Sequence, residues 1–485
     1  MHLIYSSNEV KSAENAAIAK GDRSISMISR AARALLDYIY EQKDIDCSSV
    51  LILAGRGNNG ADGILLGKML LENGSAVAFY RLSGERFSQE NLYFSENVSF
   101  LSALPEDLST FTLIVDALYG IGFHGELKAD EAQIIKRIND GGVPVLSVDI
   151  PSGVSADDGT FQTAIAATHT CALNCYKPGH FIYPGAACCG KTVLLDTDIP
   201  INDKATITAL TTDDLKALPV RPTRSNKGTF GRVAVVAGSY GMAGAAYFAA
   251  KAALLSGAGL VEIYTPEENR VILQTLLPEA VLRIYTAETD PVDLLSDLSR
   301  CSSLVIGPGL GQSSYAARLI KVILNTLTIP AVVDADGLNL CCGSALLRGY
   351  KGPLVITPHP AEASRLLDCS TNEVTGKILD GAGRLSKTYQ CTALLKDAHT
   401  VIASDEGVYL NLSGNNGMAT GGCGDVLSGI IGALLAIGLP CLDAAAFGAF
   451  IHGLAGDEAS KKHGKRSVTA SRVLDNIEEI LKDLD

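Results

Sequence analysis

Short apolar runs alternate with longer stretches of helical periodicity along most of the chain. In the first half, the pattern predicts a helix over residues 9–43, then a strand at 48–55 and a helix at 63–74. Further strands are predicted at 76–82, 112–120 and 143–153, with a helix between the last two. Apolar strands that alternate with helices indicate a parallel sheet with both faces covered.

The second half repeats this architecture without a residue-level repeat. Residues 231–266 predict strand, glycine loop, helix and strand, and later strands are predicted at 303–309, 330–337, 353–360 and 391–404. A polar, proline-containing segment at 206–227 predicts a linker between domains at 1–205 and 228–485. The expected fold is therefore α/β, with two three-layer αβα domains, the first of them Rossmann-like.

Composition narrows the classes of function. With 485 residues, 47 % hydrophobic and 19 % charged, the chain is globular and too long for one core. A net charge of −13 argues against a general nucleic-acid binder. The 12 cysteines include no Cys-x-x-Cys pair, which favours buried free thiols in a reducing compartment.

The N-terminal segment and the lengths of the apolar runs predict a cytoplasmic protein. No signal peptide is visible at the N-terminus, and the longest apolar run, 426–438, is too short to span a bilayer. The alanine-rich N-terminal helix suggests a homo-oligomer.

The stretch "NNGMATGGCGDVLSG" at 415–429 places one acid, Asp425, where a glycine-rich loop becomes an apolar helix. Free N–H groups and the helix dipole make such a loop a phosphate site. A carboxylate there is useful as the base that takes a proton from a hydroxyl attacking a phosphoryl group. The alternative is a simple helix N-cap.

This stretch, with "GPGLG", "DADGLN", "TPHPAEASRL" and "LLKDAHTVI", resembles the ribokinase-like family that holds the ADP- or ATP-dependent NAD(P)H-hydrate dehydratases. The resemblance covers about residues 225–480. Cys423, Ala361 and Asp397 depart from the residues usual in the family, and all three are small residues or loop positions.

The resemblance implies roles for particular residues. Asp425 would be the base, Mg²⁺ would accompany the nucleotide, and ADP is the expected donor. The expected nucleotide-binding residues are Lys396, Asp397, Ala398, His399, Thr400 and Gly424. The expected hydrate-binding residues are Ala245, Gly311, His359 and Asp425. The alternatives are an ordinary turn histidine at 359, a tight turn at Gly309 and Gly311, and a solvated Lys396.

Three polar strand ends occur in the first half, in "ILAGRGNNGADG", "VDALYGIGFHGE" and "VDIPSG". On one edge of a parallel sheet they would define a ligand crevice. Asn59, Asp116 and Ser152 are hard oxygen ligands with little charge, which favours a monovalent cation.

These motifs resemble the NAD(P)H-hydrate epimerase family over about residues 5–205, with Arg56 and Ala61 as departures. The resemblance implies potassium at Asn59, Asp116 and Ser152. It implies an acid/base pair of Asp149 and Lys177, against the alternatives of a turn cap and a surface lysine. The expected hydrate-binding residues are Asn58, Asn59, Gly60, Ala61, Asp62, Gly120, Ile121, Gly122, Phe123, His124, Gly125, Glu126 and Asp149.

Together the two resemblances imply a bifunctional enzyme of nicotinamide-nucleotide repair. It would interconvert the R and S hydrates of NADH or NADPH (NADHX and NADPHX) and dehydrate the S epimer with ADP, giving AMP and phosphate. Two other classes stay open. The second domain is alternatively a kinase of a small alcohol, and the first a non-catalytic nucleotide-binding module.

Overall fold

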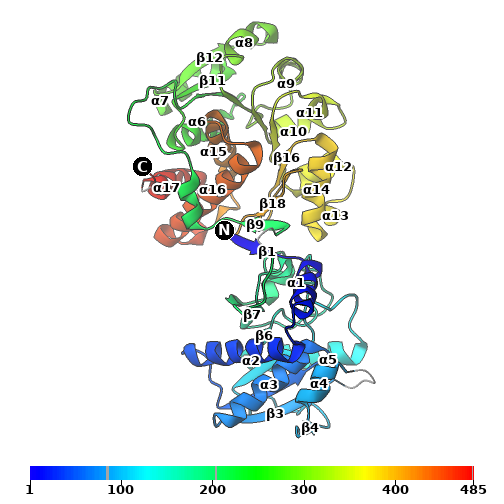
Figure 1. Ribbon diagram of the computed structural model, residues 1–485. Helices are drawn as coiled ribbons and strands as arrows, with labels where there is room; N and C mark the ends of the chain where they lie inside the picture. Colours follow the sequence, from blue (N-terminus) through cyan, green and yellow to red (C-terminus); the bar gives the residue numbers. More distant parts are fainter. Residues whose placement is uncertain (83–86, 203–204, 483, 485) are drawn as a thin grey trace. The chain divides into compact units, whose positions relative to one another are not determined.

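The computed structural model describes residues 1–82, 87–202, 205–482 and 484, and forms two compact units (Figure 1). The first unit is His2–Ile207, and the second comprises Met1 with Thr208–Asp485. Residues 203 and 204, at the end of the first predicted domain, lie outside the described residues. The predicted linker at 206–227 contains β9 (Ile207–Ala209) and a 3₁₀ helix, Thr212–Ala217.

The first unit is built on a sheet with strand order β4-β3-β2-β5-β6-β7-β8, and every pairing in it is parallel. Its strands are β2 (Ser49–Ala54), β3 (Ala76–Arg81), β4 (Phe100–Leu101), β5 (Leu113–Ala117), β6 (Val145–Val148), β7 (His169–Leu173) and β8 (Lys191–Leu195), and β1 (His2–Ile4) precedes them in the chain. Its helices are α1 (Ser7–Ala19), α2 (Ser24–Glu41), α3 (Asn58–Glu72), α4 (Gln89–Phe94) and α5 (Ala129–Asp140).

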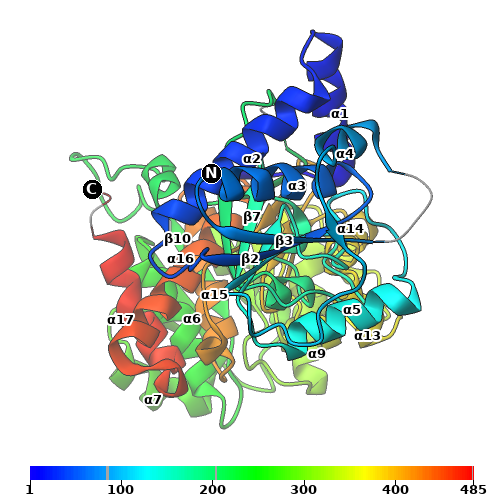
Figure 2. The ribbon, with the colours of Figure 1, turned by 90° about the horizontal axis from the view of Figure 1, so that it is seen from below.

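Alternate residues of the central strand face opposite helical layers, as the pleat requires. On β2, Val50 and Ile52 pack with α2 and α3, whereas Leu51 and Leu53 pack with α5. Figure 2 shows β2 and β3 between these two layers. Because both faces are covered, the strands are continuous apolar runs, which confirms the predicted three-layer arrangement for this unit.

Two predicted helices of the first unit differ from those observed. The helix predicted over residues 9–43 is two helices, α1 and α2, and Gly21 between them adopts φ +104°, a left-handed conformation that stops a helix. Helix α3 begins at Asn58 rather than at 63. Residues 58–62 are therefore the first turns of a helix, where backbone N–H groups lack helical partners.

The second unit has a sheet with strand order β9-β18-β17-β16-β15-β14-β13-β10-β11-β12. Its strands after β9 are β10 (Arg232–Val236), β11 (Leu260–Pro266), β12 (Val281–Tyr285), β13 (Ser303–Ile306), β14 (Ala331–Val333), β15 (Leu354–Ile356), β16 (Thr392–Leu395), β17 (Val401–Ala403) and β18 (Val408–Leu410). The strand predicted at 391–404 is wrong: it is the hairpin of β16 and β17. Pairings β16–β17 and β17–β18 are antiparallel, so the sheet is mixed rather than wholly parallel.

Helices cover both faces of this second sheet (Figure 1). One layer comprises α6 (Ala243–Leu255), α15 (Cys423–Ala436), α16 (Cys441–His463) and α17 (Ala470–Leu481). The other elements are α7 (Arg270–Leu276), α8 (Pro291–Leu298), α9 (Ser314–Thr326), α10 (Asp336–Cys341), α11 (Leu346–Gly349), α12 (Pro360–Leu367), α13 (Thr371–Gly376) and α14 (Ile378–Tyr389).

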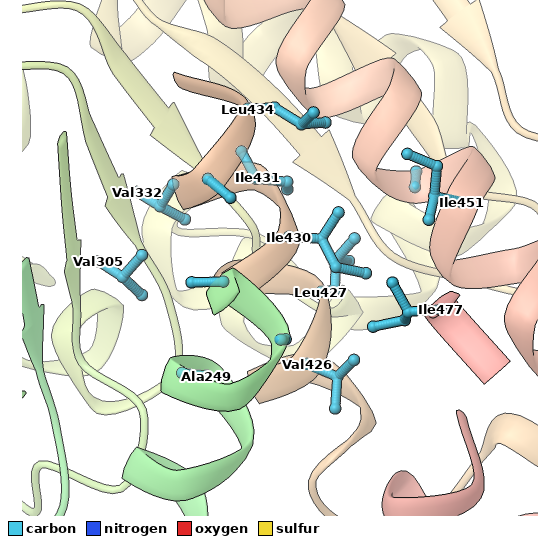
Figure 3. Close-up of a cluster of buried hydrophobic side chains, with 14 of the residues drawn as sticks. Ala249, Val305, Val332, Val426, Leu427, Ile430, Ile431, Leu434, Ile451 and Ile477 are labelled. Atoms are coloured by element: carbon cyan, nitrogen blue, oxygen red, sulfur yellow. The ribbon is translucent and has the colours of Figure 1, made fainter. Parts of the chain in front are cut away.

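Helix α15 lies at the centre of the second core. In Figure 3 its apolar side chains lie between Val305 and Val332 of the sheet and Ile451 and Ile477 of α16 and α17. Because it is covered on all sides, this helix is apolar all round, as its sequence predicts. The packing fixes the helix and therefore the position of its N-terminus, which carries Asp425.

Candidate active sites

The first candidate site is a cavity of about 420 Å³ at the carboxyl ends of the first unit's strands. Asp116 is on β5, and Asp149 directly follows β6. Asp149, Lys177 and Asn59 all line this cavity. The strand ends predicted from the sequence therefore converge on one crevice, where parallel sheets commonly bind ligands.

Asp149 and Lys177 form a buried ion pair in this cavity. Lys177 is 1 % exposed, and its Nζ contacts Asp149 Oδ1 and donates to the Leu173 carbonyl at 2.8 Å. Burial alone would lower the pKa of Lys177, but the Asp149 carboxylate raises it above its ordinary value. Asp149 also accepts a hydrogen bond from the Leu173 N–H at 3.0 Å and has φ +68°. A left-handed non-glycine residue is uncommon, and such strain clusters at functional sites.

His180 supports this pair from behind. Its Nδ1 accepts from the Lys177 N–H at 3.1 Å, so the ring proton is on Nε2, which donates to the Asp149 carbonyl at 2.7 Å. Burial, together with the charge of Lys177, lowers the pKa of His180 to about 4. The ring is therefore neutral and holds the backbone of both residues.

The three predicted cation ligands lie around one loop. Asp116, fully buried, accepts from Ser147 Oγ, the Ser152 N–H and Ser152 Oγ at 2.8, 2.8 and 2.5 Å. The Tyr119 carbonyl accepts from Asn59 Nδ2 at 3.0 Å and from Ser152 Oγ at 3.3 Å. The set contains a single carboxylate, and its other oxygens are amide, hydroxyl and carbonyl groups. This chemistry fits a monovalent cation better than a divalent one.

Only some of the predicted hydrate-binding residues line the cavity. Those that do are Asn58, Asn59, Asp62, Gly120, Ile121, Gly122, Phe123 and Asp149. Gly60, Ala61, His124, Gly125 and Glu126 are not among its lining residues. A Cβ at Gly60 would lie 2.2 Å from the Gly55 carbonyl oxygen, and Ala61 is fully buried in the core. Gly60 therefore permits the close approach of α3 to the loop before it, whereas Ala61 packs in the apolar core.

Five residues of α1 also line the cavity, and its two charged ones, Lys11 and Glu14, were missed as site residues. Neither belongs to a glycine loop or a strand end, so the sequence offers no signal for them. Burial and the nearby Asp149 raise the pKa of Glu14 above its ordinary value.

The second candidate site is at the N-terminus of α15. Gly422, the N-cap, has φ +91°, and Asp425 lies in the first turn of the helix. Asp425 is not itself the cap, so the N-cap alternative is wrong. Burial, with the charges of Asp334 and Asp336, raises the pKa of Asp425 to about 7, although Lys396 opposes the shift. A carboxyl group with this pKa is suited to act as a base near neutral pH.

Lys396 and Asp334 lie beside Asp425. Lys396 Nζ donates to Asp334 Oδ1 at 2.9 Å, and Ser428 Oγ donates to Asp334 Oδ2 at 2.7 Å. A Cβ at Gly424 would lie 3.5 Å from Lys396 Nζ, so the lysine reaches the start of α15 and is not a solvated surface residue. Asp334 was missed as a site residue, although it follows β14 as Asp149 follows β6.

The predicted hydrate-binding residues of the second unit fall into two groups. A Cβ at Gly309 would lie 2.7 Å from Ala245 Cβ, and Gly311, at φ +73°, donates its N–H to Asp336 Oδ2 at 2.9 Å. This brings Ala245 and Gly311 to the strand ends near Asp336. His359 is the N-cap of α12, where its Nδ1 accepts from the Ala361 N–H at 3.2 Å, and it is 48 % exposed.

The remaining predicted nucleotide-binding residues form the turn between β16 and β17. Asp397 and Ala398 are exposed, and His399 and Thr400 are half-buried. The Thr400 carbonyl accepts from the Asn411 N–H at 2.9 Å. The turn is therefore anchored at one end by this bond and at the other by Lys396.

The loop before α15 is tied to α16 by a residue that the sequence did not single out. Asp457 accepts from the Gly414 N–H and from Asn415 Nδ2, both at 2.8 Å. Asn415 Oδ1 in turn accepts from the Gly417 N–H at 3.0 Å. One carboxylate therefore fixes the start of the glycine-rich stretch.

Three general features follow from the described residues. The twelve cysteines are free and seven of them are buried, which confirms the predicted buried thiols at those positions. Within the described ranges, no three His, Cys, Asp or Glu side chains gather closely enough to hold a metal ion. No described helix is both long and apolar enough to cross a membrane.

Two family models match the chain. The model described as NAD(P)H-hydrate dehydratase matches residues 233–479, and that of the YjeF-related protein N-terminus matches residues 24–179. The first contains Asp425 and its neighbours, and the second contains Asp149 and Lys177.

Curated relatives match both units together. The bifunctional NAD(P)H-hydrate repair enzyme of Moorella thermoacetica is 38 % identical and covers 90 % of this chain and 88 % of its own. That of Coxiella burnetii is 35 % identical over 97 % of this chain and 98 % of its own. The corresponding Escherichia coli enzyme is 34 % identical, and the match covers 90 % of this chain and 85 % of that enzyme.

Solved structures resemble the second unit. The ADP/ATP-dependent NAD(P)H-hydrate dehydratase of Bacillus subtilis, crystallised with ATP and Mg²⁺, is 29 % identical with a TM-score of 0.51, covering 57 % of this chain and 98 % of its own. A ribokinase-like superfamily protein of Enterococcus faecalis is 28 % identical with a TM-score of 0.53. The match covers 59 % of this chain and 99 % of that protein. The predicted α/β fold with a ribokinase-like second domain is confirmed.

Proposed function

The chain belongs to the family of bifunctional NAD(P)H-hydrate repair enzymes, and we propose that Asp149 with Lys177 carries its epimerase reaction and Asp425 its dehydratase reaction. It is an NAD(P)H-hydrate epimerase and dehydratase. The observation that carries the residue assignment is the raised pKa of Asp425, about 7, at a helix N-terminus beside Lys396.

In the second unit, the substrate is the S hydrate and the co-substrate an adenine nucleotide, with ADP proposed as the donor. Asp425 takes the proton of the 6-hydroxyl as its oxygen attacks the terminal phosphorus, and AMP leaves. The ring-nitrogen lone pair then expels phosphate from C6, and loss of the C5 proton restores the dihydropyridine. Phosphate is a good leaving group, whereas hydroxide is not.

The proposed nucleotide site joins Lys396 to Thr400 and Gly424. The helix N-terminus and Lys396 offset phosphate charge. Mg²⁺ bound with the nucleotide would neutralise charge that develops on the phosphoryl oxygens. Ala245, Gly311 and His359 are the proposed contacts to the hydrate.

In the first unit, C6 carries both the ring nitrogen and a hydroxyl, so opening and reclosing the ring inverts it. The hydroxyl loses a proton as the C6–N1 bond breaks, and the aldehyde recloses after rotation. Asp149 beside Lys177 is the proposed acceptor of that proton. Potassium held by Asn59, Asp116 and Ser152 would order the loop around Tyr119, which lines the cavity.

The decisive experiment supplies the protein with mixed R and S hydrates, Mg²⁺ and either ADP or ATP. We expect both epimers to disappear, with free phosphate and the absorbance of the reduced dinucleotide appearing together. A phosphorylated product that persists would instead indicate a kinase. Faster turnover with ATP than with ADP would contradict the proposed donor.

The cation is tested separately by epimer exchange in buffers containing only sodium, only potassium or a bulky organic cation, each with a chelator of divalent ions. We expect exchange in potassium, because one carboxylate cannot offset the dehydration of Mg²⁺. Exchange that requires added magnesium would contradict the assignment.

Two further predictions rest on the sequence alone. A cytoplasmic location is proposed from the cysteine pattern, which suits a reducing compartment, and a homo-oligomer from the alanine-rich helix α1. Light scattering of the purified protein measures the second directly, and a monomeric mass would contradict it.

A further inference from the structure

The epimerase cavity contains two carboxylic acids that the proposed reaction does not yet use. Asp62 is on α3 and Glu14 on α1, and both line the cavity with Asp149 and Lys177. Ring opening needs two proton transfers, because the hydroxyl loses a proton while the departing nitrogen gains one. The role proposed above for Asp149 beside Lys177 accounts for the first transfer only.

Asp62 is buried without a partner. It is 7 % exposed, and no hydrogen bond or ion pair joins its carboxyl group to another residue in the described ranges. A buried ionised carboxylate without partners is unfavourable, so such a group keeps its proton. Burial, with the charges of Asp149 and Glu14, raises the pKa of Asp62 well above its ordinary value.

Asp149 has the opposite environment in the same cavity. Its carboxylate contacts the Lys177 ammonium and accepts a hydrogen bond from the Leu173 N–H. One cavity therefore holds an ion-paired carboxylate and, on α3, a buried carboxyl group without such a partner in the described ranges. Environments that separate two such groups commonly mark an acid and base pair.

We propose that Asp62 is the general acid of the epimerase reaction and that Glu14 is the positioning residue that keeps the proton on it. The inference rests on the epimerase function proposed above. Asp149 accepts the hydroxyl proton, the C6–N1 electron pair moves to nitrogen, and Asp62 gives its proton to that nitrogen. Reclosure on the other face of the aldehyde reverses both transfers, so no proton is gained or lost.

The charged groups around Asp62 determine its protonation. Asp149 and Glu14 disfavour its charged form. Three positively charged residues line the same cavity: Lys177, Lys11 of α1, and Arg56, which precedes α3. Asp62 is the more deeply buried of the two unpaired acids, so Glu14 ionises first and its negative charge then opposes ionisation of Asp62.

The first test is Asp62→Asn in the full chain. We expect epimer exchange to fall by about 10²–10⁴-fold, the usual effect of losing a general acid. Dehydration of purified S hydrate should be unchanged, because the second unit performs it. Asp37→Asn, an exposed aspartate on α2, is the matched control. Circular dichroism and thermal melting report whether the first unit stays folded.

The second test is the pH profile of epimer exchange in Glu14→Gln and Glu14→Asp. The acid must be protonated, so exchange falls as pH rises through the pKa of Asp62. Removing the Glu14 charge lowers that pKa, and the alkaline limb should move to lower pH in Glu14→Gln but not in Glu14→Asp. A merely structural role would lower the rate without moving the limb.

The outcomes separate this inference from the function it depends on. If the parent chain exchanges no epimers, the epimerase function itself fails. If the parent exchanges them and a folded Asp62→Asn chain does so at the parent rate, Asp62 is not the acid. An unmoved alkaline limb in Glu14→Gln would overturn the role of Glu14.

Discussion

Asp425 is the residue whose environment most directly predicts a measurable behaviour. Its pKa, raised to about 7 by burial and by Asp334, means that it is largely protonated in mildly acidic solution. A base works only when ionised, so dehydration of S hydrate should increase with pH through about 7 and level off above it. Measuring kcat/KM for the S hydrate across this range tests the assignment, and a flat profile would contradict it.

Asp425→Asn removes the base while preserving its shape. Dehydration should fall by about 10²–10⁴-fold, whereas nucleotide binding should persist, because the helix N-terminus and Lys396 are unchanged. Isothermal titration with ADP and turnover assays separate the two effects. Asp475→Asn, an exposed aspartate on α17, is the control and should match the parent.

At the residue scale, the sequence predicted what local chain geometry determines. Asp116 and Asp149 were predicted to lie together because acids at parallel strand ends share an edge, and Asp425 was singled out because a glycine loop precedes it. Asp334 satisfies the same strand-end rule and could have been found. Glu14 could not, since only tertiary packing brings α1 to the cavity.

At the scale of elements, the loop before α15 depends on α16 for its shape. Asp457→Ala would remove two hydrogen bonds to the loop, at Gly414 and Asn415, each worth about 1.5–3 kcal/mol when the acceptor is charged. We expect the KM for nucleotide to rise about tenfold or more, since each 1.4 kcal/mol is about a factor of ten. An unchanged nucleotide KM in a folded variant would show that the loop holds its shape without this contact.

The contact between α6 and α15 positions Asp425 and depends on a glycine. A Cβ at Gly429 would lie 2.1 Å from the Ala249 carbonyl oxygen, so Gly429→Ala forces the helices apart. Overpacking of this kind costs about 1–3 kcal/mol. Loss of dehydratase activity with increasing urea should therefore occur at a lower concentration.

Gly383→Ala is the matched control for this change. Gly383 lies within α14, and a Cβ there would meet no atom within 4 Å. Alanine in an open helical position stabilises by about 0.5–1 kcal/mol relative to glycine, so this variant should resist urea slightly better than the parent. Equal destabilisation by both substitutions would contradict the packing argument.

The predictions of helices and strands failed at helix breaks, which depend on a few backbone angles, and at strand pairings, which depend on long-range contacts. The predicted helix runs through residues 20–23, where the left-handed Gly21 and the extended Arg23 separate α1 from α2. The apolar residues of 391–404 fit either one strand or two. The residues at 397–400 do not by themselves indicate whether the chain turns there. Strand order and the antiparallel edge arise from long-range pairing, which local patterns do not determine.

At the scale of the whole molecule, each unit has its own sheet, its own core and its own strained acidic strand end. Asp149 follows β6 at φ +68°, and Ala335, between Asp334 and Asp336, follows β14 at φ +49°. The cavity of the first unit is lined entirely by residues of that unit. The two reactions are therefore chemically separable although one chain carries both.

Separable reactions predict complementation between two chains that each lack one of the two activities. Asp149→Ala should consume the S epimer and leave R to slow spontaneous exchange, whereas Asp425→Asn should exchange the epimers and consume neither. Because the hydrates diffuse freely, an equal mixture of the two variants should consume both epimers at close to half the parent rate at the same total protein. Rapid consumption of both epimers by Asp149→Ala alone would refute the epimerase assignment. A mixture no better than its components would mean that both reactions need an intact partner unit in the same chain.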